Sequence, residues 1–144
     1  MKGQPLRIRF RCLQDHEHSD HFHGKYMQPA GESLLVYNVD AIHDSQGTLH
    51  VTEGEFDAMI LQQSGMPAIA FPGASSFSGR HGRMLAGFNR LWIWGDPDAE
   101  FVTKVTNRLP RSARGVKLRH GDVTETFLAG GVRTLHSLVG GEEA

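Results

Sequence analysis

A chain of 144 residues is long enough to form a domain with its own hydrophobic core, without disulfides or a structural metal. Its single cysteine, Cys12, excludes a disulfide framework and any zinc ribbon built from several cysteines, and it suits a reducing cytoplasm. A net charge of −1 does not by itself indicate a nucleic-acid-binding protein. Because no apolar run reaches the length of a membrane span and the start lacks a signal-peptide core, we expect a cytoplasmic protein without membrane contact.

The first third of the sequence favours β-structure. Segment 6–13 alternates apolar and polar residues with a period of two, which predicts a strand with one arginine-bearing face. Further strands are predicted at 25–27, 34–41 and 48–52, separated by turn residues. Because strand follows strand, we expect a small antiparallel β piece at the N-terminal end.

After residue 48 strands and helices alternate. Helices are predicted at 55–64, 79–87, 99–108 and from about 124, and strands at 68–71, 90–95 and 115–119. This alternation predicts an α/β fold, with a parallel sheet of about four strands flanked by helices on both faces. Residues 91–94 are apolar throughout, as a central strand covered on both sides should be. Gly130 and Gly131 interrupt the last predicted helix.

Carboxylates between positions 53 and 125 occur in three short groups: Glu53, Glu55 and Asp57; Asp96, Asp98 and Glu100; Asp122 and Glu125. The first two groups directly follow apolar strands, and the carboxyl ends of parallel strands border the ligand-binding crevice of an open sheet. Acids gathered there repel one another unless a cation lies between them, and a divalent metal is the natural candidate. The alternative is ordinary helix capping, because acids in a first helical turn stabilise its N–H groups.

Basic residues gather separately from these acids. Segment 58–95 contains no acid and three arginines, and segment 101–120 contains six Lys or Arg residues and no acid. Basic surface near clustered acids is what a site for a metal and a polyanion requires. On charge alone, a solvated helix face followed by an exposed loop is the simpler explanation.

The acidic motifs, in this order and spacing, resemble the Toprim domain of primases, topoisomerases and several nucleases and recombination proteins. Its first motif, an apolar strand ending in Glu-Gly with Asp three residues after the glycine, matches Glu53, Gly54 and Asp57. Its second, an apolar strand ending in Asp-x-Asp, matches Asp96 and Asp98. The resemblance implies a Toprim-like Rossmannoid fold.

Within this family the sequence is most similar to DNA primases, especially those of phage primase-helicases. The similar stretches are a Val-Thr-Glu-Gly-Glu-x-Asp run at 51–57, a Gly-Ala-Ser turn at 73–75 and an Asp-x-x-Glu at 122–125. Residues 23–29 resemble the Lys-Tyr-x-x-Pro stretch that precedes the Toprim fold of bacterial primases. We therefore assign residues 1–45 to an N-terminal β-rich extension and residues 46–144 to the Toprim catalytic domain.

The resemblance implies the catalytic core of a DNA primase, a nucleotidyltransferase that makes short RNA primers from NTPs on single-stranded DNA. Mg²⁺ or Mn²⁺ is the implied cofactor, with Asp96 and Asp98 as ligands. Asp57 and Asp122 would complete the ligand set directly or through water. Glu53 is either a further ligand or the general base.

Further expectations concern partners. Candidates for contact with triphosphate or template are Lys25, Arg80, Arg83, Lys104 and Arg108. No zinc-binding module precedes residue 1 and no helicase follows residue 144. The sequence is therefore either an excised fragment or a monomeric subunit whose zinc-binding module and helicase are separate chains. We place this monomer in a bacterial or phage-infected cell.

Two other functions remain open from the sequence. A stand-alone Toprim nuclease would use the same metal cluster to cleave phosphodiesters, and the acidic motifs do not distinguish the two reactions. A non-catalytic nucleic-acid-binding module is disfavoured by the presence of both Asp96 and Asp98. Residues 99–101 depart from the primase pattern, which has a small residue and glycine there, so the approach to Asp98 differs.

Four histidines lie close together in the N-terminal third, at His16, His18, His21 and His23. Imidazoles at alternate positions lie on one face of a strand, and such a face can hold a transition metal. The duller interpretation is a polar, partly exposed loop.

Overall fold

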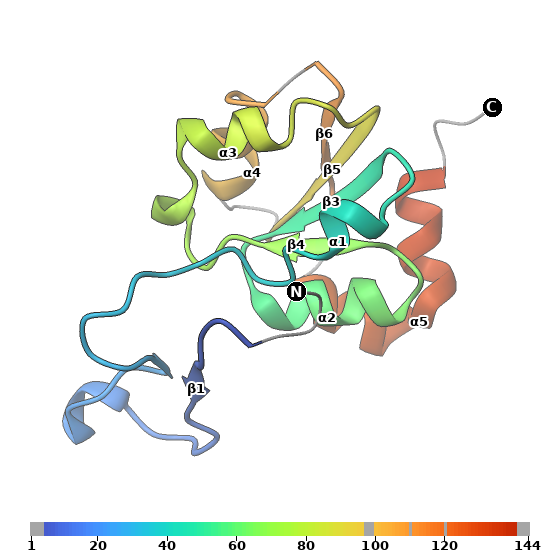
Figure 1. Cartoon of the computed structure of the whole chain (residues 1–144). Helices are drawn as coiled ribbons and strands as arrows, with labels where there is room; N and C mark the ends of the chain where they lie inside the picture. The colour runs from blue at the N-terminus through green and yellow to red at the C-terminus, as the bar shows by residue number, and fades with distance from the viewer. Residues whose placement is uncertain (1–4, 97–99, 110, 120, 141–144) are drawn as a thin grey trace. The chain divides into compact units, whose positions relative to one another are not determined.

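The computed structural model describes residues 5–96, 100–109, 111–119 and 121–140 (Figure 1). The chain divides into two compact units, with the division between Leu35 and Val36. Among the helices that the structure describes, none combines the length and the apolar character of a membrane span.

The N-terminal unit contains a two-stranded antiparallel sheet of β1 (Phe10–Arg11) and β2 (Tyr26–Met27). Between them lies a short 3₁₀ helix, η1 (His18–His21). The expected antiparallel piece is confirmed, but the strand predicted over 6–13 is wrong in length. None of residues 5–35 is buried, so the apolar side of that alternating pattern has no core to pack against.

The second unit is built on a four-stranded parallel sheet with strand order β4-β3-β5-β6. The strands are β3 (Thr48–Thr52), β4 (Ala68–Ala70), β5 (Arg90–Trp94) and β6 (Ala113–Val116). The predicted parallel sheet is confirmed. All four strands end at the same edge, because they run in one direction.

Helices cover both faces of this sheet (Figure 1). They are α1 (Ala41–Asp44), α2 (Glu55–Gln63), α3 (Gly79–Met84), α4 (Glu100–Thr106) and α5 (Val123–Gly140), with a 3₁₀ turn, η2 (Ala74–Ser76), before α3. Helices α2 and α5 contribute to one core, and α1 and α4 to the other. The interruption expected in the last helix is confirmed at Gly131, whose φ is 68°.

Alternate residues of the central strands face the two cores. Leu49 and Val51 of β3 and Ile93 of β5 belong to the core beneath α4, whereas Trp92 and Trp94 belong to the core beneath α2 and α5. All lie at 8% exposure or less. This two-sided burial explains why β5 is apolar throughout.

A buried polar pair lies within the second core. Trp94 Nε1 donates a hydrogen bond of 2.9 Å to Nδ1 of His50, and both side chains are buried. Burial, and then the charge of His136, lower the pKa of His50 to about 4. The pair is therefore neutral at physiological pH, and the indole donor fixes the imidazole tautomer with its proton on Nε2.

Two predicted elements differ from the structure. Segment 34–41 is not a strand: Tyr37 makes one isolated bridge with Ala70, and Asn38 then takes a left-handed backbone with a φ of 54°. Strand β6 begins two residues before the predicted 115–119. In β6, a Cβ on Gly115 would lie 2.7 Å from Val102 Cγ1, so glycine is what lets α4 approach the sheet.

Candidate functional site

The candidate site lies at the carboxyl ends of three neighbouring strands. In the β3–β5 pair Val51 lies opposite Ile93, so Glu53 and Asp96 follow adjacent strands at the same edge. Glu53 is half-buried and Asp96 is exposed. Asp98 lies outside the described residues.

Asp57 is held in place by a contact across the site. It lies in the first turn of α2, and its Oδ1 accepts two hydrogen bonds from Thr124 of α5, from the backbone N–H at 3.1 Å and from the hydroxyl at 2.8 Å. Its Oδ2 lies close to Gly54, where an added Cβ would be 3.3 Å away. The carboxylate is therefore oriented by α5 rather than by its own helix.

The electrostatics of Asp57 differ from those of an ordinary surface carboxylate. Its pKa is raised to about 6, mainly by burial and also by the charges of Asp122 and Asp96, while the two hydrogen bonds from Thr124 limit the rise. Three carboxylates, from the loops or helices after β3, β5 and β6, therefore interact through space. A carboxyl group whose pKa is raised toward neutral pH by burial and like charges is typical of functional sites.

Asp122 also has a structural role. Its Oδ1 accepts a hydrogen bond of 2.8 Å from the Glu125 N–H, and Glu125 Oε2 accepts one of 3.3 Å from the Asp122 N–H. This reciprocal arrangement is a capping box at the start of α5. Gly121 precedes it with a φ of 57°, and a Cβ there would overlap the Glu125 carboxylate. Asp122 therefore both caps α5 and, through its charge, raises the pKa of Asp57.

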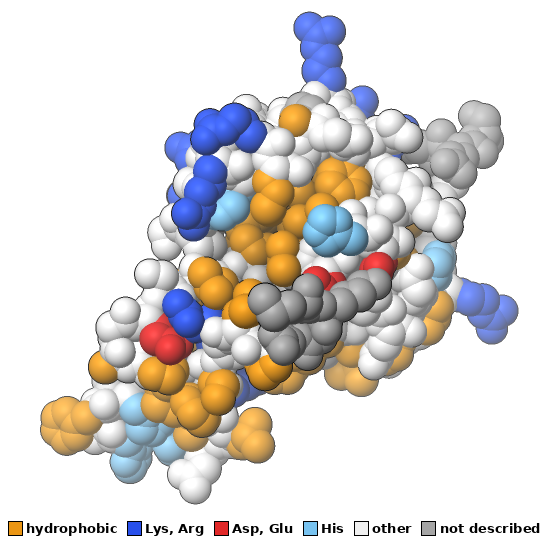
Figure 2. All heavy atoms as spheres, viewed as in Figure 1, with side chains coloured by type: hydrophobic (Ala, Val, Ile, Leu, Met, Phe, Trp, Pro, Cys, Tyr) orange, Lys and Arg blue, Asp and Glu red, His pale blue; other side chains and the backbone are white. Residues whose placement is uncertain are grey.

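The predicted cationic residues of the second unit lie on α3 and α4. Arg80 and Arg83 are exposed on α3, Lys104 is half-buried on α4, and Arg108 is exposed just beyond it. A Cβ on Gly82 would lie 3.2 Å from the Arg108 carbonyl oxygen, so α3 and the end of α4 are neighbours. Figure 2 shows Lys and Arg side chains gathered at the upper left of the molecule, where Figure 1 places α3.

A buried histidine anchors the start of α3. Ser78 N–H donates a hydrogen bond of 3.0 Å to His81 Nδ1, and the His81 ring packs 4.8 Å from that of Phe71. Burial, and then the charge of Arg80, lower the pKa of His81. These contacts hold the first turn of α3 in place and so fix the position from which the Arg80 side chain extends into solvent.

Lys25 belongs to the N-terminal unit, where it is exposed immediately before β2. The guanidinium groups of Arg9 and Arg11 lie 5.2 Å and 5.5 Å from the centre of the Tyr26 ring. This unit therefore presents two arginine cations at one aromatic ring.

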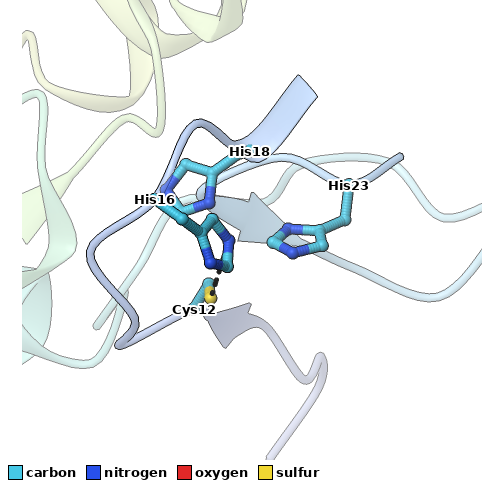
Figure 3. A group of neighbouring side chains, drawn as sticks. All are labelled: Cys12, His16, His18 and His23. Carbon is cyan, nitrogen blue, oxygen red and sulfur yellow. Dashed lines mark hydrogen bonds between the residues drawn. The ribbon is translucent and has the colours of Figure 1, made fainter. Parts of the chain in front are cut away.

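One group of side chains in the described residues has metal-ligand spacing, and it is not the carboxylate group. The candidate ligand atoms of Cys12, His16, His18 and His23 all lie within 4.8 Å of one another (Figure 3). His21, the remaining histidine of the predicted run, is exposed on η1. The prediction that these histidines lie on one face of a strand is wrong, because η1 and turns occupy this segment.

Sequence reasoning missed two residues of these sites. Thr124 reaches Asp57 because α5 packs against α2, and it lies within the Asp-x-x-Glu run at 122–125. Cys12 falls within the strand predicted over 6–13, yet its Sγ lies 3.7 Å from His16 Nε2. The spacing of Cys12, four residues before His16, is the signal that could have found it.

Solved primase structures share this fold, whereas no protein-family model matches the chain. The zinc-binding and RNA polymerase domains of the Aquifex aeolicus primase match with a TM-score of 0.72 at 18% identity, over 94% of this chain and 36% of that one. The primase fragment of the bacteriophage T7 primase-helicase protein matches with a TM-score of 0.62 at 24% identity, over 80% of this chain and 52% of that one. The fold is that of primase catalytic fragments. This chain spans about half of the length of the T7 fragment and less than half of that of the Aquifex protein.

A sequence relative places the chain more narrowly. The Gene 57 protein of Mycobacterium phage D29 is 30% identical over 118 residues, which cover 80% of this chain and 73% of that protein. The chain belongs to the family of this phage protein.

Proposed function

We propose that the chain carries the Toprim catalytic core of a phage-type DNA primase, which joins ribonucleotides into short primers on single-stranded DNA. The observation that carries the proposal is the raised pKa of Asp57 beside the charges of Asp122 and Asp96, in a fold shared with primase fragments. We assign residues 46–144 to the catalytic domain and 1–45 to the extension, of which 36–45 pack with the larger unit.

The residues present fit a hard divalent cation. Asp57, Asp96 and Asp122 offer carboxylate oxygens, the ligand type that Mg²⁺ and Mn²⁺ prefer, and their mutual repulsion favours a cation between them. Asp98 is proposed as a further ligand on the strength of the resemblance. Among the described residues these acids are not at metal-ligand spacing, so we propose that binding draws them together. A bound Mg²⁺ or Mn²⁺ would neutralise the triphosphate and stabilise the attacking and leaving oxygens.

The reaction forms one bond and breaks another at the α-phosphorus of the incoming NTP. The 3′ oxygen of the primer attacks, the bond to the bridging oxygen of the β-phosphate breaks, and pyrophosphate leaves. Glu53, half-buried at the end of β3, is assigned either to accept the 3′-hydroxyl proton or to the metal ligand set. Thr124 acts as a positioning residue by fixing the Asp57 carboxylate.

Cations of the larger unit are assigned to the phosphates. Arg80 and Arg83 lie on the helix that follows β4, and we propose that they contact the triphosphate. Lys104 and Arg108 lie toward the end of α4, where the chain returns to the start of β6, and they are assigned to the template backbone.

We also assign Lys25 to contact with template or triphosphate. The proposed partners are single-stranded DNA, NTPs, a separate zinc-binding module and a replicative helicase. The monomer would act in the cytoplasm of a bacterial or phage-infected cell.

A product assay tests the function directly. The full chain is incubated with single-stranded DNA, labelled NTPs and Mg²⁺ or Mn²⁺, and the products are separated by length. Short ribo-oligomers support primer synthesis; shortened DNA indicates the nuclease instead; neither product, with DNA binding retained, indicates a non-catalytic module.

Matched variants locate the activity. Asp96→Asn and Asp98→Asn should each abolish synthesis while the fold is retained. Glu100→Gln, which changes an exposed acid in the first turn of α4, should leave synthesis unchanged. Full activity in both Asp variants at normal metal concentrations would overturn the assignment.

A further inference from the structure

The cluster of Cys12, His16, His18 and His23 belongs to the N-terminal unit, whereas the carboxylates of the candidate site belong to the larger unit, and the proposed chemistry makes no use of the cluster. The four side chains come from the loop between β1 and β2 and point toward one another (Figure 3). From their geometry we propose that they bind one Zn²⁺ ion, which closes this loop and holds the N-terminal unit together.

The distances fit a tetrahedral site closely. Zinc bonds of about 2.0–2.1 Å to nitrogen and about 2.3 Å to sulfur place a nitrogen and a sulfur ligand about 3.6 Å apart. Cys12 Sγ and His16 Nε2 lie 3.7 Å apart. All four ligand atoms lie within 4.8 Å of one another, so the widest pair must close by at most about 1.5 Å to reach tetrahedral spacing.

The hydrogen bonds of the cluster leave a ring nitrogen of His18 and one of His23 available to bind a metal. His23 Nδ1 donates to the Gly24 carbonyl oxygen at 3.1 Å, which leaves the lone pair of Nε2 available. Such an outer hydrogen bond to a backbone carbonyl is typical of metal-ligating histidines. His18 Nδ1 is buried and has no hydrogen-bond partner in the described part of the chain, a costly state for a ring nitrogen without a ligand.

The N-terminal unit needs such a ligand, because it lacks a hydrophobic core. None of residues 5–35 is buried, and Leu13 and Phe22 are 89% and 99% exposed. The β1–β2 ladder contains only two residue pairs, with Cys12 N–H adding one hydrogen bond of 3.0 Å to the Lys25 carbonyl. A unit this small is ordinarily stabilised by disulfides or a metal, and metal binding then supplies the folding free energy.

The donor set selects the metal. One thiolate and three neutral imidazoles match zinc, a borderline-soft ion that prefers four N and S ligands. Binding releases the Cys12 thiol proton to solvent, so the site carries a net charge of +1. Ligation by Cys12 at the end of β1 and His23 just before β2 would fix the register of the two strands. The inference stands independently of the proposed primase activity.

Metal analysis of the untagged full chain tests the site without any variant. We expect one zinc per chain after dialysis. Replacement by Co²⁺ should give a thiolate-to-cobalt charge-transfer band and the intense visible bands of a four-coordinate ion. A chelator should raise the alkylation rate of Cys12, the chain's only thiol, by at least about tenfold. A zinc-free chain without the charge-transfer band in cobalt overturns the proposal.

Variants place the metal on these residues. Cys12→Ser should remove the charge-transfer band, and His18→Ala should weaken zinc binding by at least about tenfold. His21→Ala, which changes the exposed histidine of the same run, should retain zinc. Equal loss in His21→Ala, or zinc retained in a Cys12→Ser/His18→Ala double variant, overturns the assignment.

Discussion

Asp57 of α2 and Thr124 of α5 are joined by two hydrogen bonds across 67 residues of sequence. The hydroxyl bond, at 2.8 Å, lowers the pKa of Asp57 against the opposing effects of burial, Asp122 and Asp96. Thr124 therefore controls how much of the carboxylate is ionised near neutral pH. Because only the ionised form is a good metal ligand, this contact links helix packing to the proposed cation site.

Removal of the Thr124 hydroxyl should raise the pKa of Asp57. Thr124→Val keeps the backbone donor but loses the side-chain one, and a hydrogen bond to an ionised group corresponds to a rise of about one pKa unit. Mn²⁺ affinity at pH 6.5 should fall accordingly. An NMR titration of the side-chain carboxyl carbon measures the pKa directly. Thr124→Ser, which retains a hydroxyl, should titrate like the wild type; an unchanged pKa in Thr124→Val would contradict this role.

Asp57→Asn should stabilise the metal-free protein at high pH while abolishing activity. The folded chain holds this proton more tightly than the unfolded chain, because the pKa is about 6 instead of 3.8. Folding stability is therefore greatest below the unfolded pKa and falls as the pH rises through about 6. The amide cannot ionise and still accepts the Thr124 hydrogen bonds, so we expect a gain of roughly 1–3 kcal/mol at pH 8.

Thermal unfolding with a chelator measures this effect. The difference between Asp57→Asn and the wild type should be small at pH 4 and reach a plateau above pH 7. Glu100→Gln, at an exposed acid, should show no such dependence. A stabilisation of equal size at both pH values would show that ionisation of Asp57 is not its cause.

The His50–Trp94 hydrogen bond should appear as a coupling in a double-mutant cycle. His50→Leu leaves the buried indole donor unpaired, and Trp94→Phe leaves the buried acceptor unpaired. Each change should cost about 1–3 kcal/mol of unfolding free energy beyond its packing loss. The double variant should cost less than the sum by about 1 kcal/mol or more, measured by urea unfolding. Simple additivity would mean that the pair contributes no specific interaction.

The lowered pKa of His50 also predicts that the protein loses folding stability in acid. Its folded pKa of about 4 lies below the ordinary 6.5, so the unfolded chain takes up the proton first. The contribution is fully present above pH 6.5 and is lost as the pH falls toward 4. His50→Leu should remove this part of the pH dependence, which runs opposite to that of Asp57.

Gly115→Ala should destabilise the larger unit, because its methyl group would lie 2.7 Å from Val102 Cγ1. We expect a loss of about 1–3 kcal/mol, typical of overpacking. Val102→Ala should relieve the clash, so that the double variant is more stable than the sum of the single changes predicts. If Val102→Ala gives no relief, the close approach of α4 to β6 is not the reason for the glycine.

The sheet could be predicted because the apolar pattern of each strand agrees with the alternation of strands and helices along the chain. Strands β3 and β5 are apolar runs of the right length, each followed by a helix, and the parallel sheet follows from that alternation. Segment 34–41 carries the same apolar signal, but the left-handed backbone at Asn38 ends the extended run after one bridge. Periodicity alone does not report such a local turn.

The sites were only partly predictable, for a related reason. Acids that follow successive strands can be assigned to one sheet edge from topology, and this rule predicts that Asp57 and Asp96 share an edge. The contact of Asp57 with Thr124 depends on how α5 packs on α2. The Cys12–His16 contact likewise depends on the path of the loop around η1. Residue spacing can suggest Cys12 as a partner of His16, but it does not determine the path of the loop or the packing of α5 on α2.

Diffraction from a crystal soaked in Mn²⁺ tests the central claim most directly. We predict an anomalous peak at the carboxyl ends of β3 and β5, with oxygens of Asp57 and Asp96 among its ligands, and its loss in Asp96→Asn. A saturating soak that leaves this edge empty, or that gives manganese only at the cysteine–histidine cluster, would contradict the account.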